Sequence, residues 1–431
     1  MPVAFFLILI FVLAVDLLGY MGLRALFPNK GKDYGITRWI YWGADLFFIL
    51  FTVAWLTGIR TSDMPDHELY RKHFYVAGVF VSIYLPKFVF AVFSLIHQLK
   101  NFLRFLLTVA VPAKKSKQGI VSTFRWSAWI LYLGFFLALF VFLVTLHGIF
   151  YGRYQFEVVE KELWFRDLPA SFDGLRIVHF SDTHLGSFAN PGPVQEGLAR
   201  INTLDPDVII FTGDLINNNI QEVEPYIESF RALQSKEGSF SVLGNHDMGD
   251  YRRWATIEEQ EQSITHLEAF YVDVGFQLLR NASHVLRRGA DSLVVLGVDN
   301  WGLPPFLQYG KLEKALDGLD HGTFKLLLTH DPSHWRAEVV PQSNIQLTLS
   351  GHTHGMQMGL LNRFLRWSPS SWIYPEWAGT YRAGQQKIYV NRGFGFLSFP
   401  GRIGMPPEIT LLILRHGRRE ADEGHLSKTA Q

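Results

Sequence analysis

The chain has 431 residues, more than one compact domain usually needs, and its formal net charge is +1. A charge this close to neutral gives no electrostatic reason to expect a nucleic-acid partner. Cysteine is absent, which excludes disulfides and thiolate ligands, so any bound metal must be held by His, Asp, Asn or Glu.

The first third of the chain, residues 1–150, is apolar and aromatic. A helix that spans a bilayer needs about 20 mostly apolar residues. Four segments meet this requirement: 3–26, 39–58, 74–97 and 126–150. The first lacks a basic start and a small-residue cleavage site, so it is not expected to be only a cleaved signal peptide. The sequence therefore predicts a transmembrane domain with four helices and a multi-pass location in the cell membrane.

Three charged residues, Asp16, Asp45 and Lys87, lie inside the predicted spans. A charge in the hydrocarbon core is expensive, so these side chains should face the bundle interior or pair with one another. Either they line an ion or substrate path, or they pair between helices and hold the bundle together. We favour pairing, because no second polar residue repeats along a helical face.

Basic residues near the span ends predict the orientation of the chain in the membrane. They are Arg24, Lys30, Lys32 and Arg38 in the first loop, and Lys100, Arg104, Lys114, Lys115, Lys117 and Arg125 in the third. In the second loop, acidic residues offset the basic ones. Loops one and three are therefore expected to be cytoplasmic, which places both termini and the rest of the chain on the extracytoplasmic side.

From about residue 154 onward, short β-rich runs alternate with amphipathic stretches, a pattern that predicts layered α/β structure. The β-rich runs are 175–181, 208–213, 240–243, 293–298, 324–329, 345–350, 388–391 and 409–414. The amphipathic stretches include 194–202, 223–233 and 257–270. Residues 416–431 are predicted to be a polar tail.

Five of the β-rich runs end at residues that can bind a metal ion. These residues are Asp182 and His184; Asp214; Asn245, His246 and Asp247; His330 and Asp331; and His352 and His354. Ligands of layered α/β folds bind beyond the carboxyl ends of the strands, so the five ends should converge on one cleft. The pairs with i, i+2 spacing should point to one side of an extended segment. A single His or Asp at such a place is more often structural, but five motifs directly after apolar strands do not share that explanation.

The motifs Asp-x-His, Gly-Asp, Gly-Asn-His-Asp, a later His and Gly-His-x-His together resemble the calcineurin-like metallophosphoesterases, over about residues 155–415. The resemblance implies a four-layer αββα sandwich, in which two packed mixed sheets are flanked by helices, preceded by the four-helix transmembrane region. It also implies two divalent metal ions, which the sequence does not resolve among Mn, Fe, Zn and Mg. By the family pattern, one ion is held by Asp182, His184, Asp214 and His354. The other is held by Asp214, Asn245, His330 and His352, with Asp214 as the bridge.

The implied reaction is hydrolysis of a phosphodiester or pyrophosphate bond by attack of a metal-activated hydroxide. His246 is the candidate proton donor to the leaving oxygen, or else an electrostatic clamp on the phosphate, and Asp247 is expected to orient its ring. Arg392 either contacts a substrate phosphate or pairs with an acid at a sheet edge. Two positions depart from the family pattern: Asn217 stands where Asp is frequent, and Met356 where Gly is frequent.

Residues 360–377, directly after Gly-His-x-His, are rich in aromatic and apolar side chains, with Arg363 and Arg366 between them. This segment and the apolar stretches 301–307 and 396–400 suit a lipid–water interface, or they pack onto one another or onto the transmembrane bundle. We therefore expect a membrane-bound phosphoesterase whose partners are membrane lipids and a phosphate-containing, lipid-linked substrate. The alternatives are a general phosphodiesterase tethered to the membrane, and a transporter or sensor with a regulatory metallophosphoesterase domain. The sequence predicts no oligomeric state.

Overall fold

The structure is a computed structural model of the chain, and it describes residues 2–27, 32–61, 67–110, 127–304, 306–362 and 364–417. It divides into two compact units. The helical unit comprises Met1–Asp63 and Tyr75–Ile149, and the sandwich unit comprises Met64–Phe74 and Phe150–Gln431. The predicted tail lies outside the described residues from residue 418 onward. The same holds for five basic residues that support the predicted orientation: Lys30, Lys114, Lys115, Lys117 and Arg125.

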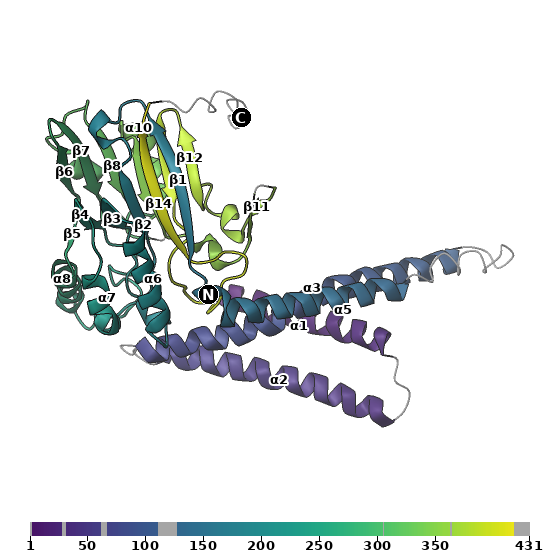
Figure 1. Cartoon of the computed structure of the whole chain (residues 1–431). Helices are drawn as coiled ribbons and strands as arrows, with labels where there is room; N and C mark the ends of the chain where they lie inside the picture. Colours follow the sequence, from purple (N-terminus) through teal and green to yellow (C-terminus); the bar gives the residue numbers. More distant parts are fainter. Residues whose placement is uncertain are drawn as a thin grey trace. The chain divides into compact units, whose positions relative to one another are not determined.

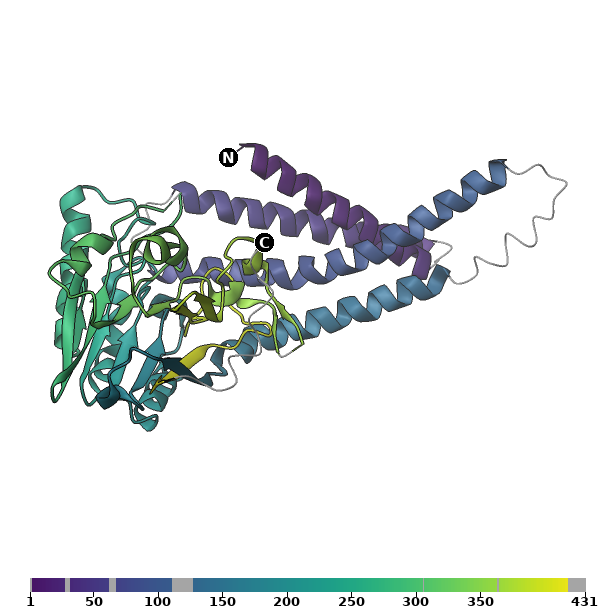
Figure 2. The same ribbon diagram turned by 90° about the horizontal axis from the view of Figure 1, so that it is seen from above.

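Four long helices, drawn in purple to blue in Figures 1 and 2, cover the four predicted spans. They are α1 (Pro2–Leu26), α2 (Lys32–Thr61), α3 (His67–Ala110) and α5 (Ser127–Phe150). Among the described residues, three stretches are long and apolar enough to cross a membrane: Leu9–Leu26, Glu68–Leu106 and Trp129–Tyr154. The second predicted span is helical, as part of α2, but is not one of these three. A fourth span therefore stays a prediction.

The three charged residues of the predicted spans meet inside the helical unit. The Lys87 ammonium donates to Asp16 Oδ1 at 3.0 Å and also contacts Asp45. The Tyr84 hydroxyl donates to Asp16 Oδ2 at 3.2 Å. Asp16 is fully buried and Asp45 nearly so. The contacts link α1, α2 and α3, and they are the interhelical pairing favoured from the sequence.

Two six-stranded sheets form the centre of the sandwich unit (Figure 1). The order of the first sheet is β1 (Glu157–Phe165), β14 (Glu408–His416), β2 (Arg176–Phe180), β3 (Val208–Phe211), β4 (Gly238–Ser241) and β5 (Phe276–Leu278). The order of the second is β12 (Gly379–Ala383), β13 (Gln386–Val390), β9 (Leu347–Ser350), β8 (Phe324–Leu328), β7 (Asp291–Gly297) and β6 (Ala282–Arg288). The pairs β14–β2, β12–β13 and β6–β7 are antiparallel and the remaining pairs are parallel, so both sheets are mixed.

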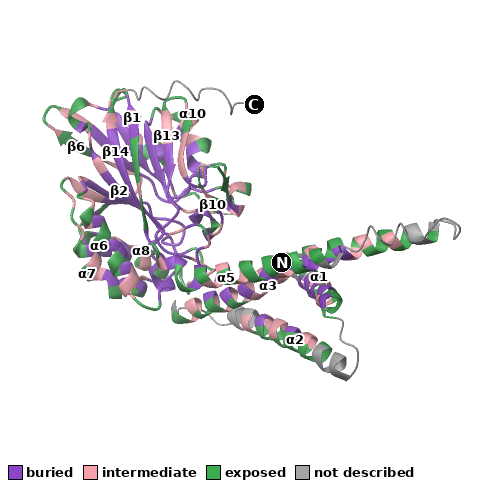
Figure 3. Ribbon diagram, turned by 45° about the vertical axis from the view of Figure 1, so that its right-hand side comes forward, coloured by how far each residue is buried: buried purple, intermediate pink, exposed green. Residues whose placement is uncertain are grey.

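Buried apolar side chains separate four layers. Successive residues of a strand point to opposite faces of a sheet. Ile210 accordingly packs between the two sheets, whereas its neighbour Ile209 packs on the outer face with α6 (Gly192–Thr203), α7 (Ile227–Arg231) and α8 (Ile257–Asp273). On the second sheet, Leu327 packs outward against α9 (Leu312–Leu316) and the π-helical turn Trp335–Val339. Figure 3 shows in purple how much of the strands is buried. The predicted αββα sandwich is confirmed.

Candidate metal centre

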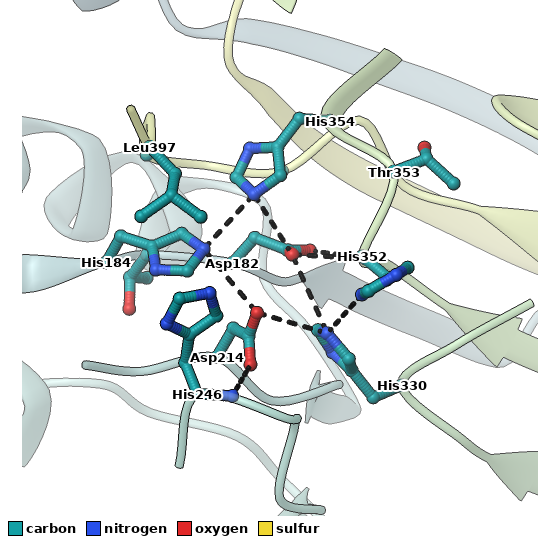
Figure 4. Close-up of polar contacts among 12 residues, drawn as sticks. Asp182, His184, Asp214, His246, His330, His352, Thr353, His354 and Leu397 are labelled. Carbon is teal, nitrogen blue, oxygen red and sulfur yellow. Dashed lines mark hydrogen bonds and ion pairs between the residues drawn. The ribbon is translucent and has the colours of Figure 1, made fainter. Parts of the chain in front are cut away.

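Five strand ends bring their polar residues together at one edge of the sandwich (Figure 4). The strands β2, β3 and β4 of the first sheet run parallel, and so do β8 and β9 of the second. Neighbouring parallel strands end at the same edge of a sheet, where ligands of such folds bind. Among the described residues, three groups have ligand atoms within 4.8 Å of one another: Asp182, His184 and His354; His184, Asp214 and His246; and Asp214, His330 and His352.

Four donors surround a first point at this edge. His184 Nε2 lies 3.1 Å from His354 Nε2. Asp182 Oδ1 lies 3.3 Å from His354 Nε2, and Asp214 Oδ2 lies 3.5 Å from His184 Nε2. Ligand atoms about 2.1 Å from a tetrahedral ion stand about 3.4 Å apart. Asp182, His184 and His354 therefore have the spacing that one divalent cation needs, and Asp214 adjoins this group through His184.

A second point lies on the other side of Asp214. Its Oδ2 atom lies 3.1 Å from His330 Nε2. His352 Nδ1 lies 3.2 Å from His330 Nε2 and 2.9 Å from Asn245 Oδ1. The same carboxylate oxygen of Asp214 thus faces both sets of donors, which is the placement that a bridging ligand needs. All eight ligand positions predicted from the sequence fall into these two sets, with Asp214 counted in each.

The i, i+2 spacing suggested that the donor pairs lie on extended backbone, but they lie on tight turns. Asp182, His184, His352 and His354 have φ angles of 55°, 45°, 70° and 50°, and Asp214 has 57°, all in the left-handed region. Backbone hydrogen bonds between the turns hold this conformation, from Asp182 N to Gly213 O at 2.9 Å and from His184 N to Asp214 O at 3.1 Å. The pairs still face one centre, but they do so through tight turns and not through strand alternation.

Glycine is required where two of these turns touch. A Cβ atom on Gly351 would lie 2.0 Å from Ser181 Oγ and 2.2 Å from Asp182 Oδ2. A Cβ atom on Gly244 would lie 2.1 Å from Asp214 Oδ1. Any larger residue would displace a carboxylate from the centre, so only glycine fits at these two positions.

Burial and charge oppose each other strongly at the centre, where the donor side chains are almost wholly buried. Burial, together with the neighbouring His246 and His354, lowers the pKa of His184 well below its ordinary value, which keeps its imidazole neutral as a metal ligand must be. Burial also acts to lower the pKa of His330, but the adjacent Asp214 carboxylate raises it to about 10. The pKa of Asp214 lies well below its usual range, because the surrounding imidazoles outweigh the effect of burial. The site is therefore built to hold positive charge beside an ionised Asp214.

His246 lies beside the two sets of donors, but Asp247 does not orient it. The His246 Nδ1 atom lies 2.7 Å from the carbonyl oxygen of Asn217, which can only accept, so Nδ1 carries the proton. Its ring stacks on Tyr251 with centroids 4.2 Å apart. The Asp247 carboxylate instead accepts backbone N–H bonds from Asp214 at 2.7 Å and from Leu215 at 2.9 Å. The expectation that Asp247 orients the ring is corrected: it shapes the turn that carries Asp214.

Arg392 is held by two carboxylates. Its guanidinium is almost fully buried, contacts Glu408 through Nε, and donates through Nη2 to Glu157 Oε2 at 2.9 Å. Glu157 lies in β1 and Glu408 in β14, at the edge of the first sheet. This is the acid pairing left open from the sequence, and a substrate contact would require Arg392 to leave both partners.

Three further residues touch the donors, and no sequence motif marked them. The Tyr374 hydroxyl lies 2.9 Å from His352 Nε2, and the Tyr251 hydroxyl accepts from Asn245 Nδ2 at 2.8 Å. Arg402 is buried, donates to the carbonyl oxygen of Gly393 at 2.9 Å, and lies 3.3 Å from His354 Nδ1. The sequence offered one signal for Arg402, a single arginine shortly after the apolar stretch 396–400. It offered no signal for the two tyrosines.

Comparison with known proteins gives matches along almost the whole chain. Residues 1–153 match a family described as the probable transmembrane domain of calcineurin-like phosphoesterases, and residues 175–356 match the calcineurin-like phosphoesterases. The metallophosphoesterase YkuE of Bacillus subtilis is 32% identical over 276 residues, which cover 62% of this chain and 90% of that protein. A transmembrane protein with metallophosphoesterase domain from Danio rerio is 26% identical over 86% of this chain and 79% of its own length. The UDP-2,3-diacylglucosamine pyrophosphatase LpxG of Chlamydia muridarum is 26% identical over 57% of this chain and 86% of its own length.

Proposed function

Because the chain belongs to the calcineurin-like metallophosphoesterases and carries a transmembrane domain, we propose that it hydrolyses a phosphodiester or pyrophosphate bond of a lipid-linked substrate. Hydrolysis of phosphoric esters is the activity of the family. The lipid substrate is our addition, and one observation carries it: large apolar side chains are exposed directly after the Gly-His-x-His turn. LpxG, by its name a pyrophosphatase for a nucleotide with two acyl groups, supports the same substrate class.

The metal centre of this proposal holds two divalent ions. Asp182, His184 and His354 would hold one, Asn245, His330 and His352 the other, and Asp214 would bridge them. Divalent ions supply Lewis acidity toward phosphoryl oxygens and lower the pKa of water. The donor set contains only carboxylate, amide and imidazole groups, which suits Mn, Fe, Zn or Mg.

His246 is the residue that we place against the phosphate. The Asn217 carbonyl holds its Nδ1 proton and Tyr251 stacks on its ring, so only Nε2 remains for a substrate oxygen. Burial lowers the pKa of His246, so the free imidazole is neutral. It acts as proton donor to the leaving oxygen only once the phosphate has brought negative charge beside it. A neutral imidazole would act instead as a positioning contact.

The lipid-facing surface of the proposal is the segment 360–373, here called the aromatic hairpin. It consists of β10 (Leu360–Leu361), β11 (Arg366–Trp367) and the short helical turn Pro369–Trp372. Phe364 is 84% exposed, Trp372 76% and Ile373 61%. Apolar patches of this kind mark contacts with membranes or other partners. Packing accounts for other members of the predicted apolar loops, since Trp301, Trp377 and Phe396 are buried.

We place the sandwich unit on the extracytoplasmic side, as the basic loops suggest. A reporter that is active only outside the cytoplasm, fused after Arg415, should be active. An inactive reporter there, together with an active cytoplasmic reporter at the same position, would reverse the orientation.

The activity is tested by incubating the purified full chain, in detergent and with Mn, Fe, Zn or Mg in turn, with a panel of lipid phosphodiesters and lipid pyrophosphates. Mass spectrometry of the products locates the cleaved bond. Asp214→Asn should abolish turnover, whereas Asp299→Asn, at a buried aspartate paired with Arg280, should not. Metal-dependent turnover by the Asp214 variant would refute the bridging assignment. Turnover of bis(p-nitrophenyl) phosphate without turnover of any lipid would favour the tethered general phosphodiesterase.

A further inference from the structure

A cavity of about 250 Å³ lies beside the aromatic hairpin, at the end away from Leu360. Its walls come from three separate segments, which contribute Leu303; Ser333, Arg336 and Ala337; and Ile373 and Tyr374. Most of the wall is apolar. Pockets for whole small ligands measure roughly 300–1,000 Å³, so this cavity has the size for one part of a substrate. We call it the His352 cavity.

The same three segments enclose His352 of the metal centre. Phe306, from the first segment, meets the His352 ring edge-on with centroids 5.2 Å apart. Asp331, which precedes the second, has its Oδ2 atom 3.5 Å from His352 Nε2. Tyr374, from the third, lies in the cavity wall and has its hydroxyl 2.9 Å from the same nitrogen. Tyr374 therefore lies both in the wall of the cavity and against a metal donor.

The other end of the cavity opens among exposed apolar side chains. Leu303 is 51% exposed and Ile373 61%, although both line the cavity. Ile373 directly follows the exposed Trp372 of the aromatic hairpin. An apolar surface thus continues from the hairpin, through these two side chains, into the cavity and up to Tyr374.

Charge at the cavity is balanced internally. Arg336 Nε donates to Glu376 Oε1 at 2.6 Å, and Glu376 is almost fully buried. The Tyr374 hydroxyl already has His352 as its partner. The wall therefore offers neither a net charge nor a free hydroxyl of Tyr374 to a polar ligand, and its apolar area favours a hydrocarbon.

We propose that the His352 cavity binds the first part of a hydrocarbon chain of the substrate, next to the phosphoryl group at the metal centre. The inference rests on the proposed function and adds where the lipid part of the substrate lies. The chain contains membrane-spanning helices, so lipid molecules are the hydrocarbon source at hand. Burial of one methylene contributes about 0.8 kcal/mol, which corresponds to a factor of about four.

The test uses the full chain in lipid nanodiscs with Mn²⁺ and a series of p-nitrophenyl alkyl phosphates from methyl to octyl. For the wild type, kcat/KM should rise by up to about fourfold per methylene and then level off once the cavity is filled. Ala337→Trp, which fills the cavity, should lower the octyl-to-methyl ratio of kcat/KM at least tenfold. Ala269→Trp is the matched control, since Ala269 is also an exposed alanine that lines a different surface cavity, and it should keep the wild-type ratio.

Calorimetry with methyl and octyl phosphate, the corresponding monoesters, gives a second readout. The octyl ester should bind more tightly than the methyl ester to the wild type and to Ala269→Trp, but not to Ala337→Trp. A flat series for the wild type, or an unchanged ratio in Ala337→Trp, would overturn the cavity proposal while leaving hydrolysis in place. A wild type that hydrolyses no ester of the series, and no substrate of the earlier panel, would instead overturn the proposed function.

Discussion

Removal of the Tyr374 hydroxyl tests whether the two sets of donors are separate metal sites. In Tyr374→Phe, His352 loses the partner of its Nε2 atom, which lies 2.9 Å from the hydroxyl oxygen. Partners of this kind fix the ring and its tautomer, and their loss typically costs 10–100-fold in metal affinity. Asp331 Oδ2, at 3.5 Å from the same nitrogen, can take over part of this role. We therefore expect a loss near the lower limit, about tenfold or 1.4 kcal/mol, at one site only.

The assay is calorimetric titration of the metal-free protein with Mn²⁺ or Zn²⁺. The wild type should bind two equivalents, and Tyr374→Phe should weaken one of them, because His354 and His184 do not touch Tyr374. Adding Asp331→Asn should weaken the same equivalent further. Tyr309→Phe is the control, since its hydroxyl bonds to Asp250 at 2.8 Å, away from the donors. Equal weakening of both equivalents, or none in the double variant, would refute the division into two sites.

Three other variants test the helical unit, the pH response and the turns. Lys87→Met should destabilise the helical unit by about 3–5 kcal/mol, because it leaves Asp16 and Asp45 buried without their cation. Thermal unfolding in detergent should show this loss. If pairing is the cause, the triple variant that also carries Asp16→Asn and Asp45→Asn should recover most of the lost stability. Burial lowers the pKa of His179 to about 4, below its unfolded value of about 6.5, so the unfolded state takes up a proton first as the pH falls. This residue should therefore contribute no pH dependence above pH 6.5 and remove about 3 kcal/mol of stability between pH 6.5 and 4; in His179→Gln that part of the dependence should vanish, and equal pH profiles for the two proteins would contradict it. Gly351→Ala should weaken metal binding and lower stability by about 1–3 kcal/mol, because the new Cβ would displace Asp182, whereas Gly322→Ala, with open space around it, should change neither in the same titration and melting experiments.

The sequence predicted the parts of the fold that repeat a simple physical pattern. Central strands such as β3, with the sequence Val-Ile-Ile-Phe, are short apolar runs, because both of their faces are covered. Edge strands were missed. β1 has the sequence Glu-Val-Val-Glu-Lys-Glu-Leu-Trp-Phe and is largely exposed over its first six residues, so its composition is that of a surface loop.

At the metal centre, the sequence predicted the candidate metal ligands. It missed contacts to these ligands that form only in the folded chain. The Asp and His residues are identifiable because five such motifs follow apolar strands, and a structural role does not explain all five. Nothing in the sequence says that Asp247 turns toward backbone amides, or that Tyr374 comes back to His352. These contacts depend on left-handed turns and on loops that meet only in three dimensions.

The left-handed turns have a consequence for the history of the chain. Each non-glycine residue held at positive φ costs about 1–2 kcal/mol, and five donor residues are held in this way. Replacing any of them by glycine would relieve that backbone strain while destroying the donor. A related chain that no longer needs to hydrolyse a substrate would therefore gain stability when it loses these ligands. Glycine or asparagine would be expected at its positions 182, 184, 214, 352 and 354. Aspartate and histidine at these five positions thus lower the stability of the backbone, and their ligand atoms explain why they are there.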